Sequence, residues 1–271
     1  MRPHLDLDLD RFPLHRPDSA DYQNLVDAKR DDWTRNGAFS LPGFMAKGDA
    51  DKAAKELLSA FDTVSYRHRK AHNVYFSSPS KSLPTDLAEP TLFTSHSSLT
   101  GDQLVGTAIR AVYDWDPLCD FLRRVMQLPA LYRMADPMAC LNVMSYGPGD
   151  GLDWHFDRAG FAVTILLQAA EEGGAFEYRR NLRSDDDPNY DGVRRVLSGN
   201  DDTVRRSQAE PGTLTVFAGR QSVHRVAPVL GGTRVMAVLS FMEQADYHYS
   251  AEDRIRFYGR GQPSDAPVRG I

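Results

Sequence analysis

The sequence predicts a mainly β chain of the α+β class, with a double-stranded β-helix of jelly-roll, cupin-like type as its core and supporting helices from the N-terminal half. Two observations lead to this prediction. Residues 140–242 contain short β-branched and apolar runs separated by turns rich in Gly and Pro, which is typical of antiparallel strands. Earlier in the chain, apolar residues recur at helical spacing. Because 271 residues suit one domain with helical additions, we expect residues 1–271 to form a single domain.

Composition limits the kind of protein that this chain can be. With 41% hydrophobic and 25% charged residues it resembles an ordinary globular protein. A net charge of −5 argues against nucleic-acid binding, which needs a basic surface. Cys119 and Cys140 are too few for a disulfide framework, and free thiols suit a reducing compartment. The sequence has neither a membrane-length apolar stretch nor a secretory signal, so we expect a cytoplasmic protein without membrane partners.

The N-terminal half, residues 1–139, is expected to supply supporting helices and a lid. The apolar spacing predicts helices over residues 18–34, after Asp49, around residues 104–112 and from Pro117 onward. Residues 77–100 are rich in Ser, Pro and Thr and are interpreted as one long loop. Loops of that length in a domain are often functional lids.

The C-terminal half, residues 140–271, is expected to form the β-helix core. Residues 161–168 and 174–178 are predicted to pair as a hairpin. The charged stretch 179–208 interrupts the sheet as an insertion with a short helix, which either covers the functional site or decorates the surface. The final strands are expected at residues 213–218, 224–229 and 234–242.

The most informative stretch is LNVMSYGPGDGLDWHFDRAGFAVTILLQ, residues 141–168. On a strand, His155 and Asp157 stand two residues apart and therefore share one face. His224 follows a later strand, and Arg234 begins another ten residues further on. Two imidazoles and one carboxylate form the facial triad that binds Fe(II) and leaves three adjacent coordination positions open. A 2-oxo acid can fill two of these positions, and O2 the third.

The competing interpretation is that these residues bind no metal, because a His-x-Asp pair is common by chance and a lone histidine is usually a core or surface residue. The context favours the metal site, since His155, His224 and Arg234 all stand where strands are expected. Arg234 would offer a planar, two-pronged donor for the distal carboxylate of 2-oxoglutarate. The cofactors expected from the sequence are therefore Fe(II), 2-oxoglutarate as co-substrate, and O2.

Similarity to a known family extends over most of the chain. The segments that carry it are LDLDRFPLH at 7–15, LPGFM at 41–45, HNVYF at 72–76, WHFDRAGFAVTILLQ at 154–168, GGAFEY at 173–178, Asn189-Tyr190, GRQSVHRVAPV at 219–229 and YGR at 258–260. With these segments the chain resembles the Fe(II)/2-oxoglutarate-dependent oxygenases, and among them the BesD-like group of amino-acid halogenases and hydroxylases.

The resemblance implies a role for each matching residue. It makes His155, Asp157 and His224 the iron ligands and Arg234 the 2-oxoglutarate anchor, and it matches Tyr146 with a tyrosine that contacts 2-oxoglutarate in some related oxygenases. Halogenating members carry a small residue in place of the carboxylate, which leaves a position for chloride. This chain has Asp157 there, so the resemblance implies hydroxylation of an unactivated C–H bond.

The resemblance also implies a small polar substrate, a free amino acid. His72 and Asn73 are candidates for lining the substrate pocket. Arg158 would suit a substrate carboxylate better than an ammonium group, or it is a surface salt-bridge partner. Two other functions remain open at this point: a non-catalytic, cupin-like metal-binding protein, and a peptide or protein hydroxylase with an open groove.

Overall fold

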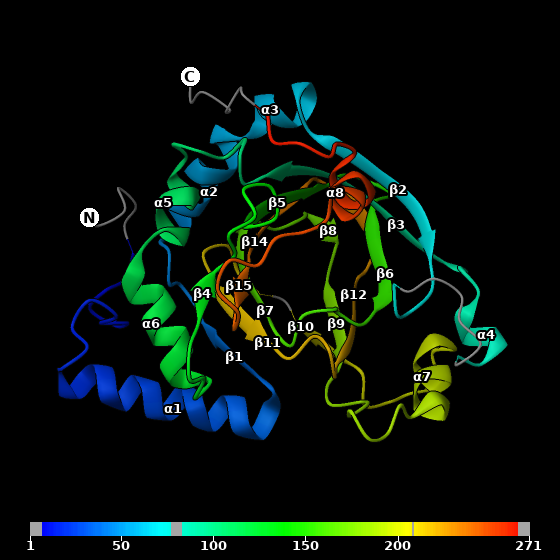
Figure 1. Cartoon of the computed structure of the whole chain (residues 1–271), viewed down its shortest axis with the longest axis horizontal. Coiled ribbons are helices and arrows are strands. Elements are labelled where there is room, and N and C mark those ends of the chain that lie inside the picture. The colour runs from blue at the N-terminus through cyan, green and yellow to red at the C-terminus, as the bar shows by residue number, and fades with distance from the viewer. Residues whose placement is uncertain (1–6, 77–82, 208, 265–271) are drawn as a thin grey trace.

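The computed structural model describes residues 7–76, 83–207 and 209–264, and its main feature is one curled antiparallel sheet with helices outside it (Figure 1). The sheet has 11 strands. They are β1 (Ala38–Leu41), β2 (Tyr66–His72), β3 (Leu92–Thr100), β5 (Leu141–Tyr146), β6 (Gly151–His155), β7 (Ala162–Gln168), β9 (Phe176–Arg179), β10 (Arg205–Ser207), β11 (Leu214–Phe217), β12 (Val223–Val226) and β14 (Arg234–Leu239).

The order of the strands is β1-β11-β7-β14-β5-β3-β6-β12-β9-β10, with β2 paired to β3 off this path. β1 and β10 are therefore the two ends of the curled sheet. Two small sheets pair β8 (Glu172–Gly173) with β13 (Val229–Gly231) and β4 (Tyr132–Arg133) with β15 (Phe241–Met242). Since β1, β2 and β3 come from the N-terminal half, the sheet is not confined to residues 140–271 as the sequence suggested.

Helices lie on two sides of the sheet (Figure 1). They are α1 (Ala20–Asn36), α2 (Lys47–Glu56), α3 (Leu58–Thr63), α4 (Thr85–Ala88), α5 (Ala108–Tyr113), α6 (Asp116–Val125), α7 (Tyr190–Leu197) and α8 (Ala251–Tyr258). In the view of Figure 1, α1, α2, α5 and α6 lie on one side of the sheet, and α4 and α7 lie on the other. The helices expected over 18–34 and from Pro117 onward are confirmed.

The sequence determines α1 and α6 locally. The Ser19 hydroxyl accepts a hydrogen bond from the Tyr22 N–H at the start of α1, and Gly37 ends that helix with a φ of 61°, a conformation that favours glycine. Pro117 stands in the first turn of α6, where a missing N–H costs nothing. The side chains of α6 that pack into the main core are Leu118, Phe121, Leu122 and Val125.

The insertion at 179–208 belongs to the scaffold of the sheet. Val193 and Val196 of α7 are buried in a second apolar cluster. Its other members include Trp154 of β6, Phe156 just after β6 and Val223 of β12. Further along, the insertion adds β10 to the sheet. The α7 helix therefore does more than decorate the surface, because it packs against the strands that carry His155 and His224.

Two expectations about local structure were wrong. Residues 77–100 are not one loop, because 85–88 form α4 and 92–100 form β3 in the middle of the sheet; residues 77–82 lie outside the described part. Residues 161–168 and 174–178 do not form a hairpin: β7 pairs with β11 and β14, and β9 pairs with β12 and β10. Pairing in a curled sheet is non-local, and a local pattern does not reveal it.

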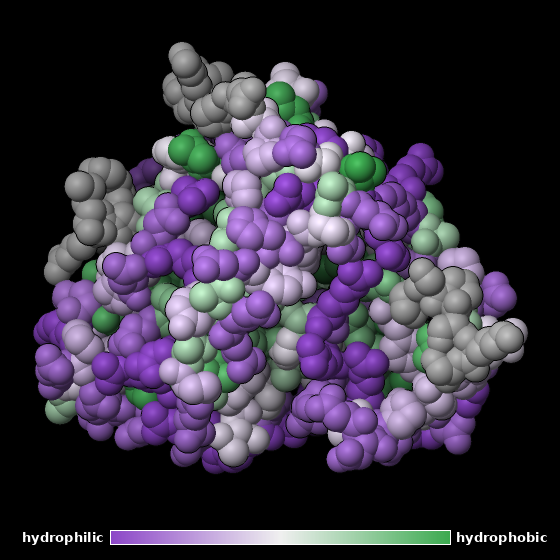
Figure 2. Space-filling view, in the orientation of Figure 1, coloured by the Kyte–Doolittle hydropathy of each residue, from purple (hydrophilic) through white to green (hydrophobic). Residues whose placement is uncertain are grey.

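The surface gives no sign of a membrane span. None of the described helices is long and apolar enough to cross a bilayer. Hydrophilic residues dominate the face shown in Figure 2, and the apolar residues visible there are scattered. Isolated apolar residues of this kind are normal on a protein surface and need no partner.

Asp136 connects the region of α8 to the segment that leads into β5. Its buried carboxylate accepts hydrogen bonds from the backbone N–H groups of Met138 and Ala139 at 2.9 and 3.0 Å. It also accepts from the Tyr249 N–H at 3.1 Å and from Arg254 Nε at 2.8 Å. Burial alone would raise the pKa of this carboxyl, but the Ala139 N–H, the Arg254 guanidinium and the other donors lower it below the ordinary value.

Replacing Asp136 with Asn should therefore lower the free energy of unfolding by about 2–4 kcal/mol at pH 7, because the change removes the charge of a fully buried carboxylate that pairs with the partly buried Arg254. Since the folded-state pKa is lowered, this stabilisation is present above the unfolded pKa and is lost as the pH falls. The difference between wild type and Asp136→Asn should shrink below about pH 4. Urea denaturation across this pH range measures it. The matched control is Asp116→Asn, in an exposed ion pair, which should change stability by less than about 1 kcal/mol. Equal effects of the two variants would contradict the assigned role.

Candidate metal centre

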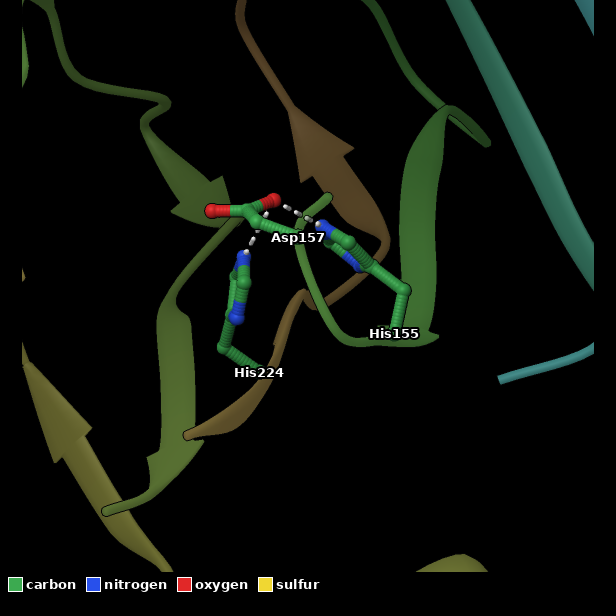
Figure 3. Close-up of side chains that lie close together, drawn as sticks. All are labelled: His155, Asp157 and His224. Atoms are coloured by element: carbon green, nitrogen blue, oxygen red, sulfur yellow. Dashed lines mark ion pairs between the residues drawn. The ribbon is translucent and has the colours of Figure 1, made fainter. Parts of the chain in front are cut away.

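Three residues predicted from the sequence meet at one point inside the curled sheet (Figure 3). His155 is the last residue of β6, Asp157 follows two residues later, and His224 is the second residue of β12. β6 and β12 are neighbours in the sheet, and His155 and His224 are Cα partners in their antiparallel pairing. The register shifts after this pair, which marks a bulge of the kind often found next to active sites. Backbone pairing thus brings distant parts of the chain together.

The spacing of the three side chains suits a shared ion. Asp157 Oδ1 lies 3.6 Å from His155 Nε2 and 3.5 Å from His224 Nε2, and the three candidate donor atoms all lie within 4.8 Å of one another. These separations exceed ordinary hydrogen bonds. Neighbouring ligands bound at about 2.1 Å to one metal lie about 3 Å apart, so small adjustments would bring all three into a coordination shell. Within the described residues, no other group of three or more such side chains is arranged in this way.

Backbone carbonyls orient both imidazoles. His155 Nδ1 lies 2.8 Å from the Asp153 carbonyl oxygen, and His224 Nδ1 lies 2.9 Å from the Ser222 carbonyl oxygen. Because a carbonyl oxygen only accepts, each Nδ1 carries a hydrogen, which makes Nε2 the nitrogen by which each ring in its neutral form can bind a metal. This is the arrangement by which proteins fix metal-binding histidines. The donor set of two imidazole nitrogens and a carboxylate oxygen fits Fe(II).

Ionisation at the centre favours metal binding at neutral pH. Burial, followed by the neighbouring His224, lowers the pKa of His155 to about 4, so this ring is neutral at pH 7. Burial would raise the pKa of Asp157, but its interactions with His224 and His155 hold this pKa well below the ordinary range. Neutral imidazole and ionised carboxylate are the forms in which these side chains bind metals.

Gly219 makes room for the carboxylate. Its carbonyl oxygen accepts a hydrogen bond from the Asp157 N–H at 3.1 Å. A Cβ atom at position 219 would lie 1.9 Å from Asp157 Oδ2 and 2.6 Å from Asp157 Cγ. Any side chain at this position would therefore push the carboxylate away from the two histidines.

Arg234 is a buried cation without a hydrogen-bond or ion-pair partner for its side chain among the described residues. It is the first residue of β14, its side chain is 6% exposed, and its Nε has no hydrogen-bond partner in the described structure. Burial lowers its pKa. Tyr146 is its Cα partner across the sheet, and burial raises the pKa of this phenol, which keeps it neutral and able to donate. A guanidinium buried without an anion is costly, so this arrangement is suited to receive an anionic ligand.

His96, which the sequence interpretation missed, lies between these two groups. The strands β14, β5, β3, β6 and β12 are consecutive in the sheet, and His96 stands on β3 at its centre. Its ring lies 5.2 Å from that of Tyr146 and is stacked at 4.4 Å on His68, and neither ring nitrogen has a hydrogen-bond partner in the described structure. The polar alternation of Thr94, His96 and Ser98 was the available signal, but it lay within a segment interpreted as a loop.

The three substrate candidates have different surroundings. His72 is buried and its ring lies 4.3 Å from that of Phe76, which in turn lies 4.9 Å from the His155 ring. Asn73 donates to the Ala88 carbonyl and accepts from the Tyr75 N–H, so its amide connects the end of β2 to the last residue of α4. His72 is thus close to the triad, while the Asn73 amide bonds to the backbone groups of Ala88 and Tyr75.

Arg158 lies at the surface and connects segments. Its guanidinium lies 3.3 Å from Asp253, donates to the Phe76 carbonyl at 3.5 Å and covers the Phe257 ring at 5.2 Å. This pattern agrees with the alternative of a surface salt-bridge partner.

Comparison with known proteins identifies the family. Residues 96–256 match the family model HalD, described as Halogenase D, and they make up more than half of the chain. The chain belongs to this family. The match begins at His96 and includes the triad, Tyr146 and Arg234. No curated protein matches the sequence significantly.

Several solved structures resemble this member of the Halogenase D family in fold. The carbocyclase SnoK from nogalamycin biosynthesis, a non-haem α-ketoglutarate-dependent enzyme, is 12% identical with a TM-score of 0.56; the alignment covers 91% of this chain and 96% of SnoK. A Trichoplax adhaerens prolyl hydroxylase in complex with a peptide is 13% identical with a TM-score of 0.54, covering 84% and 96%. AviO1 from Streptomyces viridochromogenes Tue57 is 17% identical with a TM-score of 0.53, covering 82% and 96%.

At these identities the likeness concerns the fold. The predicted double-stranded β-helix is confirmed, and the Halogenase D family chain has the fold of the 2-oxoglutarate–Fe(II) oxygenases.

Replacing Gly219 with Ala should weaken Fe(II) binding by about tenfold or more without unfolding the protein, because the new methyl group displaces the Asp157 carboxylate. Anaerobic Fe(II) titration, with circular dichroism to check folding, measures this. Gly160→Ala is the matched control, since a Cβ atom at position 160 meets nothing within 4 Å. In an Asp157→Ala background, Gly219→Ala should have little further effect. The same loss in both backgrounds would show that the clash with Asp157 is not the cause.

Proposed function

We propose that this chain is a non-haem Fe(II), 2-oxoglutarate-dependent dioxygenase that hydroxylates an unactivated C–H bond of a small polar substrate, a free amino acid, and that residues 1–271 act as one domain. One observation carries the proposal: two imidazoles and a carboxylate converge inside the sheet that also holds Arg234, a buried cation that no described residue pairs with. A metal site and an anion site in one interior are what such an enzyme requires.

Each residue has a defined task in this function. His155, His224 and Asp157 hold the metal, and the carbonyls behind the two imidazoles keep their Nε2 atoms directed at it. Arg234 pairs with the distal carboxylate of 2-oxoglutarate, and the neutral Tyr146 phenol is placed across the sheet to donate to the same ligand. When bound, Fe(II) and 2-oxoglutarate supply the activation of O2 that makes an unactivated C–H bond reactive. The burial of His155, His224 and Arg234 excludes water from this chemistry.

The carboxylate of Asp157 supports hydroxylation rather than halogenation. The family carries the description Halogenase D, and a halogenating centre needs a coordination position for a halide. In this chain Asp157 lies close to both histidines and would occupy that position, while Gly219 secures its place. We therefore assign the chain to the hydroxylase type of the BesD-like group.

The substrate class rests on the sequence resemblance to enzymes that act on amino acids. A peptide hydroxylase is the alternative with structural support, because a neighbour in fold is a prolyl hydroxylase in complex with a peptide. A non-catalytic metal-binding protein is disfavoured, since it would leave the buried charge of Arg234 without a counterion.

Anaerobic addition of Fe(II) and 2-oxoglutarate to the purified protein should produce a weak visible charge-transfer band.

Arg234→Gln should raise the 2-oxoglutarate concentration at half-saturation of this band by about 100-fold, because a buried charge-assisted pair is lost. Arg234→Lys should lie between Gln and wild type, since it keeps the charge but loses the two-pronged geometry. Absence of the band in wild type would favour the non-enzyme, and an unchanged half-saturation in Arg234→Gln would contradict the assigned anchor.

Incubation with a panel of free amino acids, 2-oxoglutarate and O2 should give succinate and one product heavier by a single oxygen atom. Asp157→Ala should abolish this product, because the triad loses its only anionic ligand, while the exposed Asp185→Ala should keep it. Succinate release and product mass are the readouts. Hydroxylation at the wild-type rate by Asp157→Ala would contradict the ligand assignment, and a panel without turnover would point to the peptide alternative.

A further inference from the structure

A cleft of about 890 Å³ opens between the two ends of the curled sheet. Its lining includes Ser40 from β1 and Thr215 and Phe217 from β11 at one end, and residues of β9 and β10 at the other. On β9 it is lined by Phe176 and Tyr178 but not by Glu177, and on β10 by Arg205 and Ser207 but not by Arg206. Because alternate residues of a strand face opposite sides, the cleft is the inner side of the sheet.

The aromatic wall of this cleft reaches the metal centre. The ring of Phe217 lies 4.7 Å from the imidazole of His224, and the ring of Phe176 lies 5.5 Å from it. The two phenylalanine rings are 5.1 Å apart and contact each other. A molecule in the cleft would therefore lie against aromatic rings that contact a proposed iron ligand.

The charged residues that line the cleft are mainly basic. Among the described lining residues, Glu210 is acidic, and the basic ones are Arg11, Lys47, Arg180 and Arg205. Arg11 lies 3.5 Å from Asp8, and Arg180 donates a hydrogen bond to Asn36. Such a lining favours an anionic occupant.

Arg205 is the basic residue best placed to bind it. Its Cα partner on β9 is Tyr178, and the Cα partner of Tyr178 on β12 is His224. The three side chains therefore share the inner face, and Arg205 stands two strands, about 10 Å, from the proposed iron ligand. No hydrogen bond or ion pair joins its guanidinium to any residue in the described part of the chain.

We propose that the substrate enters through this cleft and that Arg205 binds its carboxylate, so that the enzyme acts on carboxylate-bearing molecules held with their apolar part against Phe176 and Phe217. This inference rests on the proposed function, whose metal centre supplies the reaction. The distance of two strands suits a small molecule whose reacting carbon lies a few bonds from the carboxylate. A planar guanidinium can bind that carboxylate through two parallel hydrogen bonds.

The test uses two fluorescent probes that differ only in the charge: N-dansylglycine, which has a free carboxylate, and N-dansylglycinamide, which is neutral. The wild-type protein should bind dansylglycine about tenfold more tightly, as expected for one charge-assisted contact. Arg205→Gln should abolish this preference while leaving the binding of the amide unchanged. Arg206→Gln is the matched control, because it removes the same charge one residue away on the opposite face of β10.

Three results would overturn the inference: no binding of dansylglycine, equal binding of both probes by wild type, or equal losses in Arg205→Gln and Arg206→Gln. Probe binding requires neither iron nor turnover, so its failure is distinguishable from failure of the proposed function, which is seen in the charge-transfer band.

With the amino acid that supports succinate release, Arg205→Gln should raise KM for that substrate about tenfold and leave KM for 2-oxoglutarate unchanged. A rise in both constants would contradict a specific role in substrate binding.

Discussion

The pairing of β6 with β12 is the constraint on which the metal centre depends. It places His155 opposite His224, and the two backbone carbonyls behind their rings leave both Nε2 atoms free to face Asp157. The pairing is braced from outside by the apolar cluster under α7, and Gly219 leaves space for the carboxylate. A small shift of one strand would separate the donors, because a slip by a single residue turns a side chain to the opposite face.

Charge balance links the metal centre to the interior beyond it. Arg234 is buried without an anion, and an Fe(II) ion bound by one carboxylate would add further positive charge to the same interior. In the proposed function a dianionic 2-oxo acid would neutralise both charges together. The basic lining of the cleft near Arg205 extends this preference for anions toward the surface. The two proposals together place anionic ligands at two positions of the interior.

Local patterns in the sequence predicted which site residues lie together better than they predicted the topology. The triad and Arg234 could be found because a metal site restricts residue type and strand position together, and the helix at Pro117 because capping and apolar spacing are local signals. By contrast, β3 was taken for part of a loop. Its buried residues Thr94, His96 and Ser98 are polar, so the segment lacks the apolar alternation that indicates a strand. The predicted pairing of β7 with β9 was wrong, because strands of a curled sheet pair with segments far apart in sequence. Arg205 was not singled out for the same reason: only the register of β10, β9 and β12 brings it near His224.

The most direct test of the central claim is an anaerobic crystal structure of the protein with Fe(II) and 2-oxoglutarate. It should show one metal ion bound by His155 Nε2, His224 Nε2 and a carboxylate oxygen of Asp157, with the distal carboxylate of 2-oxoglutarate on Arg234. A metal ion bound elsewhere, or a 2-oxoglutarate molecule that leaves Arg234 without a partner, would contradict it.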